Sequence, residues 1–531
     1  MGGRETKATT PDPLTGLRGL ASLHVMLFHY FLHSRNLLMI LGGTHVYSKI
    51  HLQGSIEMPM FFILSGFSLS LGYGSSKGRM GGGGGGGGSG NRLKYGRYFR
   101  NRFARIAPIY YLSQVAFLPA YFHTQHPSIR HGPTTFWKTV LFTATCTNTW
   151  FSPWVNLPFY LPAWTINTFF FFYLTFPFLL SRLERLSDIQ LANLVVYLFW
   201  LQLIPFGILL SIFPEYFWPL TANPLSRLPV FVMGIIAGLQ NLREKDEDYG
   251  FVDPNLHQSI LHCLFPWGLH ENYKRLPLHE SQANNRKYEA QIWRRRVDLS
   301  TLIIILLMAI ATIASSLWGD QWKALSYDSH LRVLSKLWIP VNDLGQLYLV
   351  HLHLIIIVGL TRDQGSSFLS RICRTDICQY LGLISMTLYL IHYDIPLYLM
   401  WAVYPDASYS SADCHQLSLN SSFSSVVADL EIIGNNSCLQ FFALRQTLPN
   451  WGIALLCLAV PSLAWLIYNF IEEPARKVLR APRNNTSSRI IVKSGAVKEI
   501  EHIVPLLSNE SQTDDLVAAA IARNLDEKLK T

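Results

Sequence analysis

The chain has 531 residues, of which 50% are hydrophobic and 15% are charged, and its formal net charge is +10. The apolar residues come in long blocks, which excludes an ordinary soluble globular protein and predicts a chain that crosses the membrane several times. Lys and Arg concentrate between these blocks, so the positive charge reflects membrane topology and not nucleic-acid binding.

Ten apolar blocks are long enough to span the bilayer as helices. In chain order they are residues 14–38, 55–73, 104–122, 162–181, 190–213, 228–241, 299–318, 336–360, 381–404 and 449–471. The polar ends of residues 134–148 leave too little apolar length for a span, and we expect a re-entrant or surface-lying segment there. The predicted fold class is an all-α, polytopic membrane bundle of about ten transmembrane helices.

Basic loops predict the orientation of this bundle. Residues 74–105 carry eight Lys or Arg and no acid, and short loops of this kind stay in the cytoplasm. Alternation of the spans then divides the chain into a cytoplasmic N-terminus at 1–13, a membrane domain at 14–480 and a cytoplasmic tail at 481–531. Within the membrane domain it predicts a Gly-rich basic cytoplasmic loop at 74–103, a cytoplasmic insertion at 242–298 and a lumenal or extracellular loop at 405–448. We expect a multi-pass protein of the plasma membrane or an endomembrane.

The exterior loop 405–448 contains glycosylation sequons at Asn420 and Asn435 and two cysteines, Cys414 and Cys438. The sequons predict a glycoprotein, and the two cysteines are placed where a disulfide on the outer side of the membrane can form; whether they are bridged stays open. The remaining cysteines do not have the spacing of a zinc site, so no metal is expected.

Arg18 and His29 lie in the first block with ten residues between them. Eleven helical steps bring His29 to within roughly 20° of the face of Arg18 and place it about 16 Å deeper. Lipid strongly disfavours such groups, so each of them needs a partner or a function. A histidine bonded to a backbone carbonyl and an arginine anchored to lipid headgroups would also explain the pair.

Six motifs in chain order are similar to those of the acyltransferase-3 family of integral-membrane O-acyltransferases. The first is the pair Arg18 and His29. The others are Phe61-Phe62-Ile63-Leu64-Ser65-Gly66-Phe67, Arg102-Phe103-Ala104-Arg105-Ile106-Ala107-Pro108-Ile109-Tyr110, Pro162-Ala163-Trp164-Thr165-Ile166, Gly382-Leu383-Ile384-Ser385 with Tyr389 and His392, and Ile471-Glu472-Glu473-Pro474. The resemblance covers about residues 12–480.

The resemblance implies transfer of an acyl group, with acetyl expected, from acyl-CoA to a hydroxyl of a carbohydrate, lipid or secondary metabolite. His29 is the expected general base, because a neutral imidazole can remove the hydroxyl proton during attack on the thioester. Arg18, Arg102 and Arg105 are expected to bind the acyl-CoA through charge-assisted hydrogen bonds. Membrane orientation is an alternative role for Arg102 and Arg105.

We expect Glu57, Trp164, Tyr110 and His392 to contribute to the acceptor site. Other roles stay open for them, because aromatic residues often pack or anchor membrane helices, a buried histidine is often structural and an acid at a helix end is often solvated. The expected partners are acyl-CoA, the hydroxylated acceptor and membrane lipid.

One residue departs from the family pattern. Phe169 stands five residues after Trp164, where family members usually have a carboxylate. Either the site works without this acid or Glu57 replaces it. Two other functions are open: a transporter or flippase, which predicts internal repeats that we do not find, and an inactive acyltransferase-fold scaffold, which Phe169 favours.

Overall fold

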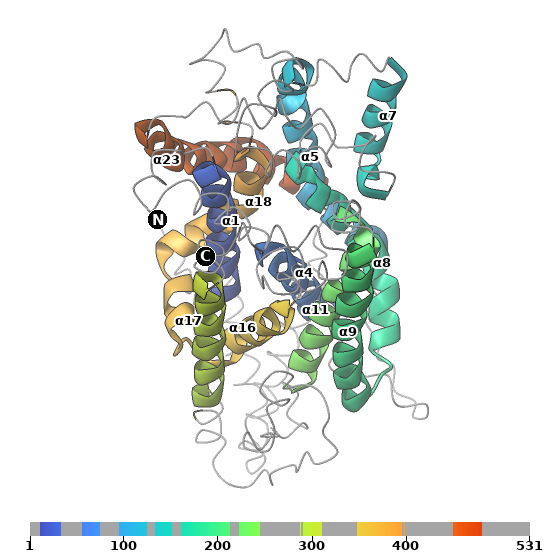
Figure 1. Cartoon of the computed structure of the whole chain (residues 1–531), viewed down its shortest axis with the longest axis vertical. Coiled ribbons are helices and arrows are strands. Elements are labelled where there is room, and N and C mark those ends of the chain that lie inside the picture. The colour runs from blue at the N-terminus through green and yellow to red at the C-terminus, as the bar shows by residue number, and fades with distance from the viewer. Residues whose placement is uncertain are drawn as a thin grey trace, which may run out of the picture. The chain divides into compact units, whose positions relative to one another are not determined.

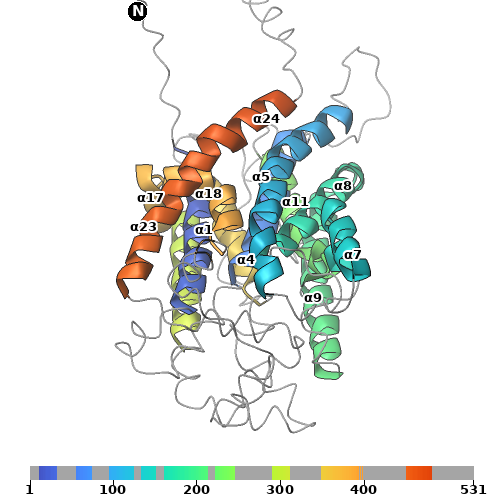
Figure 2. The same cartoon turned by 90° about the horizontal axis from the view of Figure 1, so that it is seen from above.

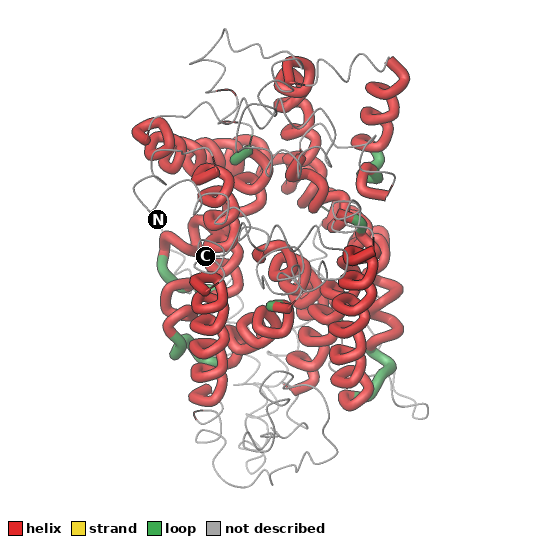
Figure 3. Tube along the Cα trace, viewed as in Figure 1, coloured by secondary structure: helices red, strands yellow, loops and turns green. Residues whose placement is uncertain are grey.

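The computed structural model describes residues 11–32, 56–74, 95–124, 133–150, 161–212, 222–244, 287, 290–310, 348–393, 395, 398 and 450–480. The chain divides into two units, Met1–Leu479 and Arg480–Thr531, and all the helices below belong to the first. Over the described residues every regular element is a helix, which confirms the predicted all-α class (Figures 1 and 3).

The helices are α1 (Pro13–Leu32), α4 (Glu57–Tyr73), α5 (Tyr95–Thr124), α7 (Pro133–Ala144), α8 (Trp164–Leu183), α9 (Asp188–Ile212), α11 (Pro224–Glu244), α16 (Val350–Arg362), α17 (Phe368–Cys373), α18 (Asp376–Ile391), α23 (Asn450–Ile467) and α24 (Glu473–Leu479). Short 3₁₀ turns η2 (Asn148–Trp150) and η3 (Leu161–Ala163) precede α8, and the π-helical turn η5 (Tyr468–Glu472) joins α23 to α24. A further helix covers residues 290–310 and is yellow-green in Figure 1.

Three stretches of the described chain are long and apolar enough to cross a membrane, judged by length and composition. They are Trp164–Leu183, Pro224–Arg243 and Ala454–Leu479, and they correspond to the predicted spans 162–181, 228–241 and 449–471. The other seven predicted spans and the cytoplasmic termini stay predictions. The middle stretch, α11, has 72% of its apolar window buried inside the protein, so it lies at the centre of the bundle.

Several helix ends differ from the prediction. α5 begins at Tyr95 instead of 104, so the last part of the predicted loop 74–103 is helical. The helix over 290–310 likewise begins inside the predicted insertion 242–298. Backbone hydrogen bonds continue through charged residues beyond the apolar block, and hydrophobicity alone therefore misses these ends.

α18 is shifted toward the N-terminus relative to the predicted block 381–404. It begins at Asp376 because the Thr375 side chain caps it by accepting from the backbone N–H of Cys378, and it ends at Ile391. α7 has 12 residues, and a helix of that length covers about 18 Å, less than the ~30 Å hydrocarbon core. Its length agrees with the prediction that residues 134–148 do not span.

Three predicted regions lie outside the described residues. They are the Gly-rich run near 81–90, the exterior loop with its sequons, Cys414 and Cys438, and the tail 481–531.

Glycine contacts hold the two helix pairs on which the candidate site depends. In α4 and α11, a Cβ added at Gly66 would overlap the carbonyl oxygen of Phe231, and one added at Gly234 would overlap that of Ile63. In α1 and α18, a Cβ added at Gly19 would meet the backbone of Gly382. Small residues allow membrane helices to approach until their backbones touch. α1 lies beside α18 in both views (Figures 1 and 2).

The α4–α11 contact predicts a selective effect of added methyl groups. Gly66→Ala and Gly234→Ala should each destabilise the protein by about 1–3 kcal/mol, because a side chain forced into a packed contact displaces the backbone. The measurement is thermal unfolding in detergent. Gly72→Ala is the matched control on the same helix, since nothing lies within 4 Å of its added Cβ. Equal effects at Gly66 and Gly72 would contradict the described packing.

Candidate active site

His29 of α1 and His392 at the end of α18 contact each other directly. The Nδ1 of His29 lies 3.1 Å from the Nε2 of His392 and 2.8 Å from the carbonyl oxygen of Val25. The Nδ1 of His392 lies 2.7 Å from the carbonyl oxygen of Tyr389. The contact lies ten residues beyond the Gly19–Gly382 contact on both helices, so the close approach of α1 and α18 sets the histidine pair.

The two backbone carbonyls determine the tautomer of each ring. A carbonyl oxygen can only accept, so Nδ1 carries the hydrogen in both imidazoles. The Nε2 of neutral His392 then carries a lone pair, which accepts a hydrogen bond from the Nδ1–H of His29. The second nitrogen of His29, its Nε2, keeps its lone pair, and the residue is partly exposed. This nitrogen has the form that a general base requires.

Tyr389 connects the histidine pair to α8 and α4. Its ring lies 5.6 Å from that of His392. Its hydroxyl lies 3.2 Å from the hydroxyl of Thr165, one residue after Trp164, and 3.7 Å from the sulfur of Met58, one residue after Glu57. The ring of Phe61 lies 6.2 Å from the Tyr389 ring. Residues from three of the sequence motifs therefore meet around Tyr389, which was not among the predicted site residues.

The predicted donor-binding arginines lie together at the other end of α1. The Nη2 of Arg18 donates to the Thr15 hydroxyl at 3.0 Å, and its Nε is buried without a hydrogen-bond partner among the described residues. Arg105 of α5 lies within electrostatic range of Arg18 and of Arg102. The guanidinium of Arg102 lies 5.6 Å from the Tyr73 ring and 5.8 Å from the Tyr173 ring.

Acidic residues neighbour this cluster but bond a different arginine. Arg476 of α24 pairs with Glu473, and its Nη1 lies 3.7 Å from Glu472 Oε1. Glu472 is also bonded by the hydroxyl of Thr387 from α18. Within the described part of the chain, Arg18, Arg102 and Arg105 do not hydrogen-bond a carboxylate, so the cluster retains positive charge for an anion.

Glu57 does not contact His29. Its Oε1 lies 2.7 Å from the Nδ1 of His24, on a different face of α1. Glu57 therefore does not lie beside His29 in place of the carboxylate that family members usually have. The contact between Glu57 and His24 was not predicted, because a single sequence gives no signal for the packing of α4 against α1.

Phe169 lies in an aromatic cluster instead of beside the histidines. Its ring is 5.2 Å from that of Phe62, 6.3 Å from that of Phe172 and 6.2 Å from that of Tyr173. The contacts with Phe62 and Phe172 are edge-to-face, and such contacts stabilise beyond the area they bury. At position 169, where family members usually have an acid, this chain has a phenylalanine that packs α8 against α4.

Two further predicted residues occupy buried positions. Tyr110 is 0% exposed, and its hydroxyl lies 3.0 Å from the carbonyl oxygen of Thr143 and 3.1 Å from the Asn167 side chain. Trp164 begins α8 with its ring 6.4 Å from Phe62. Tyr110 thus takes part in a buried network between α5, α7 and α8, and a contact of either residue with an acceptor stays a prediction.

One cysteine lies close to the arginine end of α1. Cys373 of α17 is 0% exposed, and its backbone packs against Gly16. Burial raises the pKa of this thiol to about 12. Because the thiolate is the nucleophilic form of cysteine, Cys373 is not suited to carry an acyl group between donor and acceptor.

The family model described as an acyltransferase domain, that of the acyltransferase-3 family, matches residues 13–469. The chain belongs to this family of membrane-associated acyltransferases. The match ends just before Glu472, so the last of the six motifs lies beyond it. The chain matches no curated protein and no solved structure.

The aromatic contacts of Phe169 predict that an acid at this position, as in most family members, would destabilise this protein. Phe169→Asp should lower stability by about 1–3 kcal/mol, because it removes ring contacts and introduces a charge without a partner. Thermal unfolding measures the effect, and Phe169→Leu, which keeps an apolar side chain, is the control. Equal stability of the Asp and Leu variants would contradict the view that an apolar side chain at position 169 stabilises the packing of α4 and α8.

Proposed function

We propose that this protein is a membrane O-acyltransferase that moves an acyl group, with acetyl expected, from acyl-CoA to a hydroxyl of a carbohydrate, lipid or secondary metabolite. The single observation that carries the proposal is the histidine pair, in which backbone carbonyls leave the Nε2 of His29 unprotonated. The arginine cluster at the other end of α1, which joins Arg18 of α1 to Arg102 and Arg105 of α5, supports the donor assignment.

His29 would act as the general base. As its Nε2 takes the proton of the acceptor hydroxyl, the oxygen attacks the thioester carbonyl to form a tetrahedral intermediate. Collapse of that intermediate breaks the carbon–sulfur bond, and the proton passes from His29 to the departing thiolate. The products are the ester and free CoA, so His29 returns to its neutral form.

His392 would stabilise the positive charge of His29 between these two proton transfers. The Nδ1–H of imidazolium His29 faces the Val25 carbonyl and the Nε2 lone pair of His392. In serine hydrolases a carboxylate holds the base in this way. Here a neutral imidazole and a peptide carbonyl would do so, which explains how the site can work with Phe169 in the usual position of the acid.

Arg18, Arg102 and Arg105 would bind the phosphates of the donor. Arginines form directional, charge-assisted bonds to phosphate oxygens. Arg18 and His29 lie about 16 Å apart along α1, a distance that an extended pantetheine arm can bridge. The donor would thus reach from the arginine cluster to the histidine pair along one helix.

An inactive acyltransferase fold used as a scaffold is the second candidate, and Phe169 is the observation in its favour. A transporter or flippase is a further alternative. Both alternatives predict that the folded wild-type protein does not turn over acyl-CoA, because neither uses acyl transfer.

The direct test uses purified protein with acetyl-CoA and a panel of hydroxylated acceptors. His29→Ala should lower kcat by about 10²–10⁴-fold, the usual contribution of a general base. Arg18→Ala should mainly raise the KM for acetyl-CoA. His351→Ala, which removes a histidine from α16, is the control and should keep its turnover. A folded wild type without donor turnover, or His29→Ala at wild-type rate, would contradict the proposal.

The histidine contact yields its own prediction. His392→Leu should lower kcat with little change in the KM for acetyl-CoA, because it removes one of the two acceptors of the Nδ1–H of His29 and no contact with the acyl donor. His392→Gln should recover part of the lost kcat, since its amide oxygen can accept the same hydrogen bond. Steady-state kinetics at several donor concentrations separate the two constants. Equal losses in both variants would indicate a packing role for His392.

A further inference from the structure

The helix over residues 290–310 has one face closed by the protein. Trp293 is 3% exposed and Val297 is 0% exposed. A Cβ added at Gly359 of α16 would meet both of these side chains. The guanidinium groups of Arg296 and Arg362 each lie 4.9 Å from the Trp293 ring. This face is therefore the contact that holds the helix on α16.

The opposite face is an exposed apolar stripe. Its residues are Leu299 (57% exposed), Leu302 (51%), Ile305 (56%), Leu306 (49%) and Ile310 (57%). From Leu299 to Ile310 the helix rises about 16 Å, close to half of the ~30 Å hydrocarbon core of a bilayer. The stripe thus has the length of the acyl-chain region of one leaflet.

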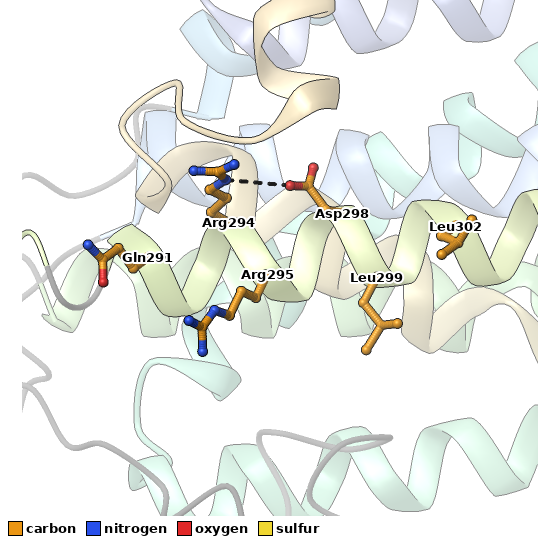
Figure 4. A pocket seen from close by; sticks show the side chains of 6 residues that line it. All are labelled: Gln291, Arg294, Arg295, Asp298, Leu299 and Leu302. Carbon is orange, nitrogen blue, oxygen red and sulfur yellow. Dashed lines mark ion pairs between the residues drawn. The ribbon is translucent and has the colours of Figure 1, made fainter.

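A recess with basic side chains lies at the start of this stripe. It has a volume of about 650 Å³ and is lined by Gln291, Arg294, Arg295, Asp298, Leu299 and Leu302 (Figure 4). In Figure 4 Arg294 points toward Asp298, and Arg295 projects on the side of Leu299. The recess therefore joins cationic groups to the first residues of the apolar stripe.

The charge of this recess is positive. The Nε of Arg294 lies 3.7 Å from the Oδ2 of Asp298, whose Oδ1 accepts from the backbone N–H of Phe368 at 2.8 Å. Asp298 is thus shared with the start of α17. Among the described residues Arg295 has no carboxylate within ion-pair distance.

We propose that this recess binds the headgroup of an anionic phospholipid. Arg294 and Arg295 would bind the lipid phosphate and the negative headgroup. Leu299 and Leu302 would lie along the upper part of an acyl chain. The apolar stripe directly beside the arginines favours a lipid over free phosphate, because free phosphate has no chain to occupy it.

The test is native mass spectrometry of the full chain in detergent, with phosphatidylserine or phosphatidylcholine added. Wild type should retain phosphatidylserine more strongly than phosphatidylcholine. The double variant Arg294→Gln/Arg295→Gln should weaken phosphatidylserine binding by about 10- to 30-fold, given the attraction of two arginines to an anionic surface. Leu302→Ser should weaken it less and should leave the protein folded, since that side chain is exposed.

Arg182→Gln/Arg185→Gln is the matched control, because both arginines are exposed at the end of another apolar helix. It should change phosphatidylserine binding by less than about twofold. Equal losses in the two double variants would overturn the proposal in favour of a general basic surface. Displacement of the lipid by millimolar inorganic phosphate, or equal retention of the two lipids by wild type, would also overturn it. None of these measurements depends on acyl transfer.

Discussion

The close approach of α1 and α18 is the contact on which the candidate site depends. Gly19 and Gly382 let the two backbones touch, and a side chain on either residue would push the helices apart. Ten residues further along both helices, the same register brings the Nδ1 of His29 to 3.1 Å from the Nε2 of His392. Without this approach the two rings could not share a hydrogen bond.

Polar groups inside a membrane bundle require partners, and the two ends of α1 meet this requirement differently. At the histidine end, two backbone carbonyls and one ring nitrogen satisfy the Nδ1 atoms, which fixes the rings. At the arginine end, the Nε atoms of Arg18 and Arg102 are buried without a partner among the described residues. Buried donors without partners are costly, so the arginine end keeps unused hydrogen-bond donors, whereas the Nδ1 atoms at the histidine end are satisfied within the protein.

The sequence predicts what depends on position along one helix. The common face of Arg18 and His29 follows from helical geometry, and long apolar blocks predict most of the helices. It does not predict which residues meet across helices. The pairing of Glu57 with His24, and of His392 with His29, depends on the packing of α4 and α18 against α1. The same limit applies to Phe169, whose replacement of an acid has a clear reason only once Phe62 and Tyr173 are placed around it.

The most direct test of this account is an electron cryomicroscopy structure of the protein with a non-hydrolysable acyl-CoA analogue. The account predicts the donor phosphates at Arg18, Arg102 and Arg105 and the acyl carbonyl on the Nε2 side of His29. It also predicts that the hydrogen bond between His29 and His392 persists in the complex. An analogue bound away from α1, or with its carbonyl beside Glu57 and His24 instead, would contradict the account.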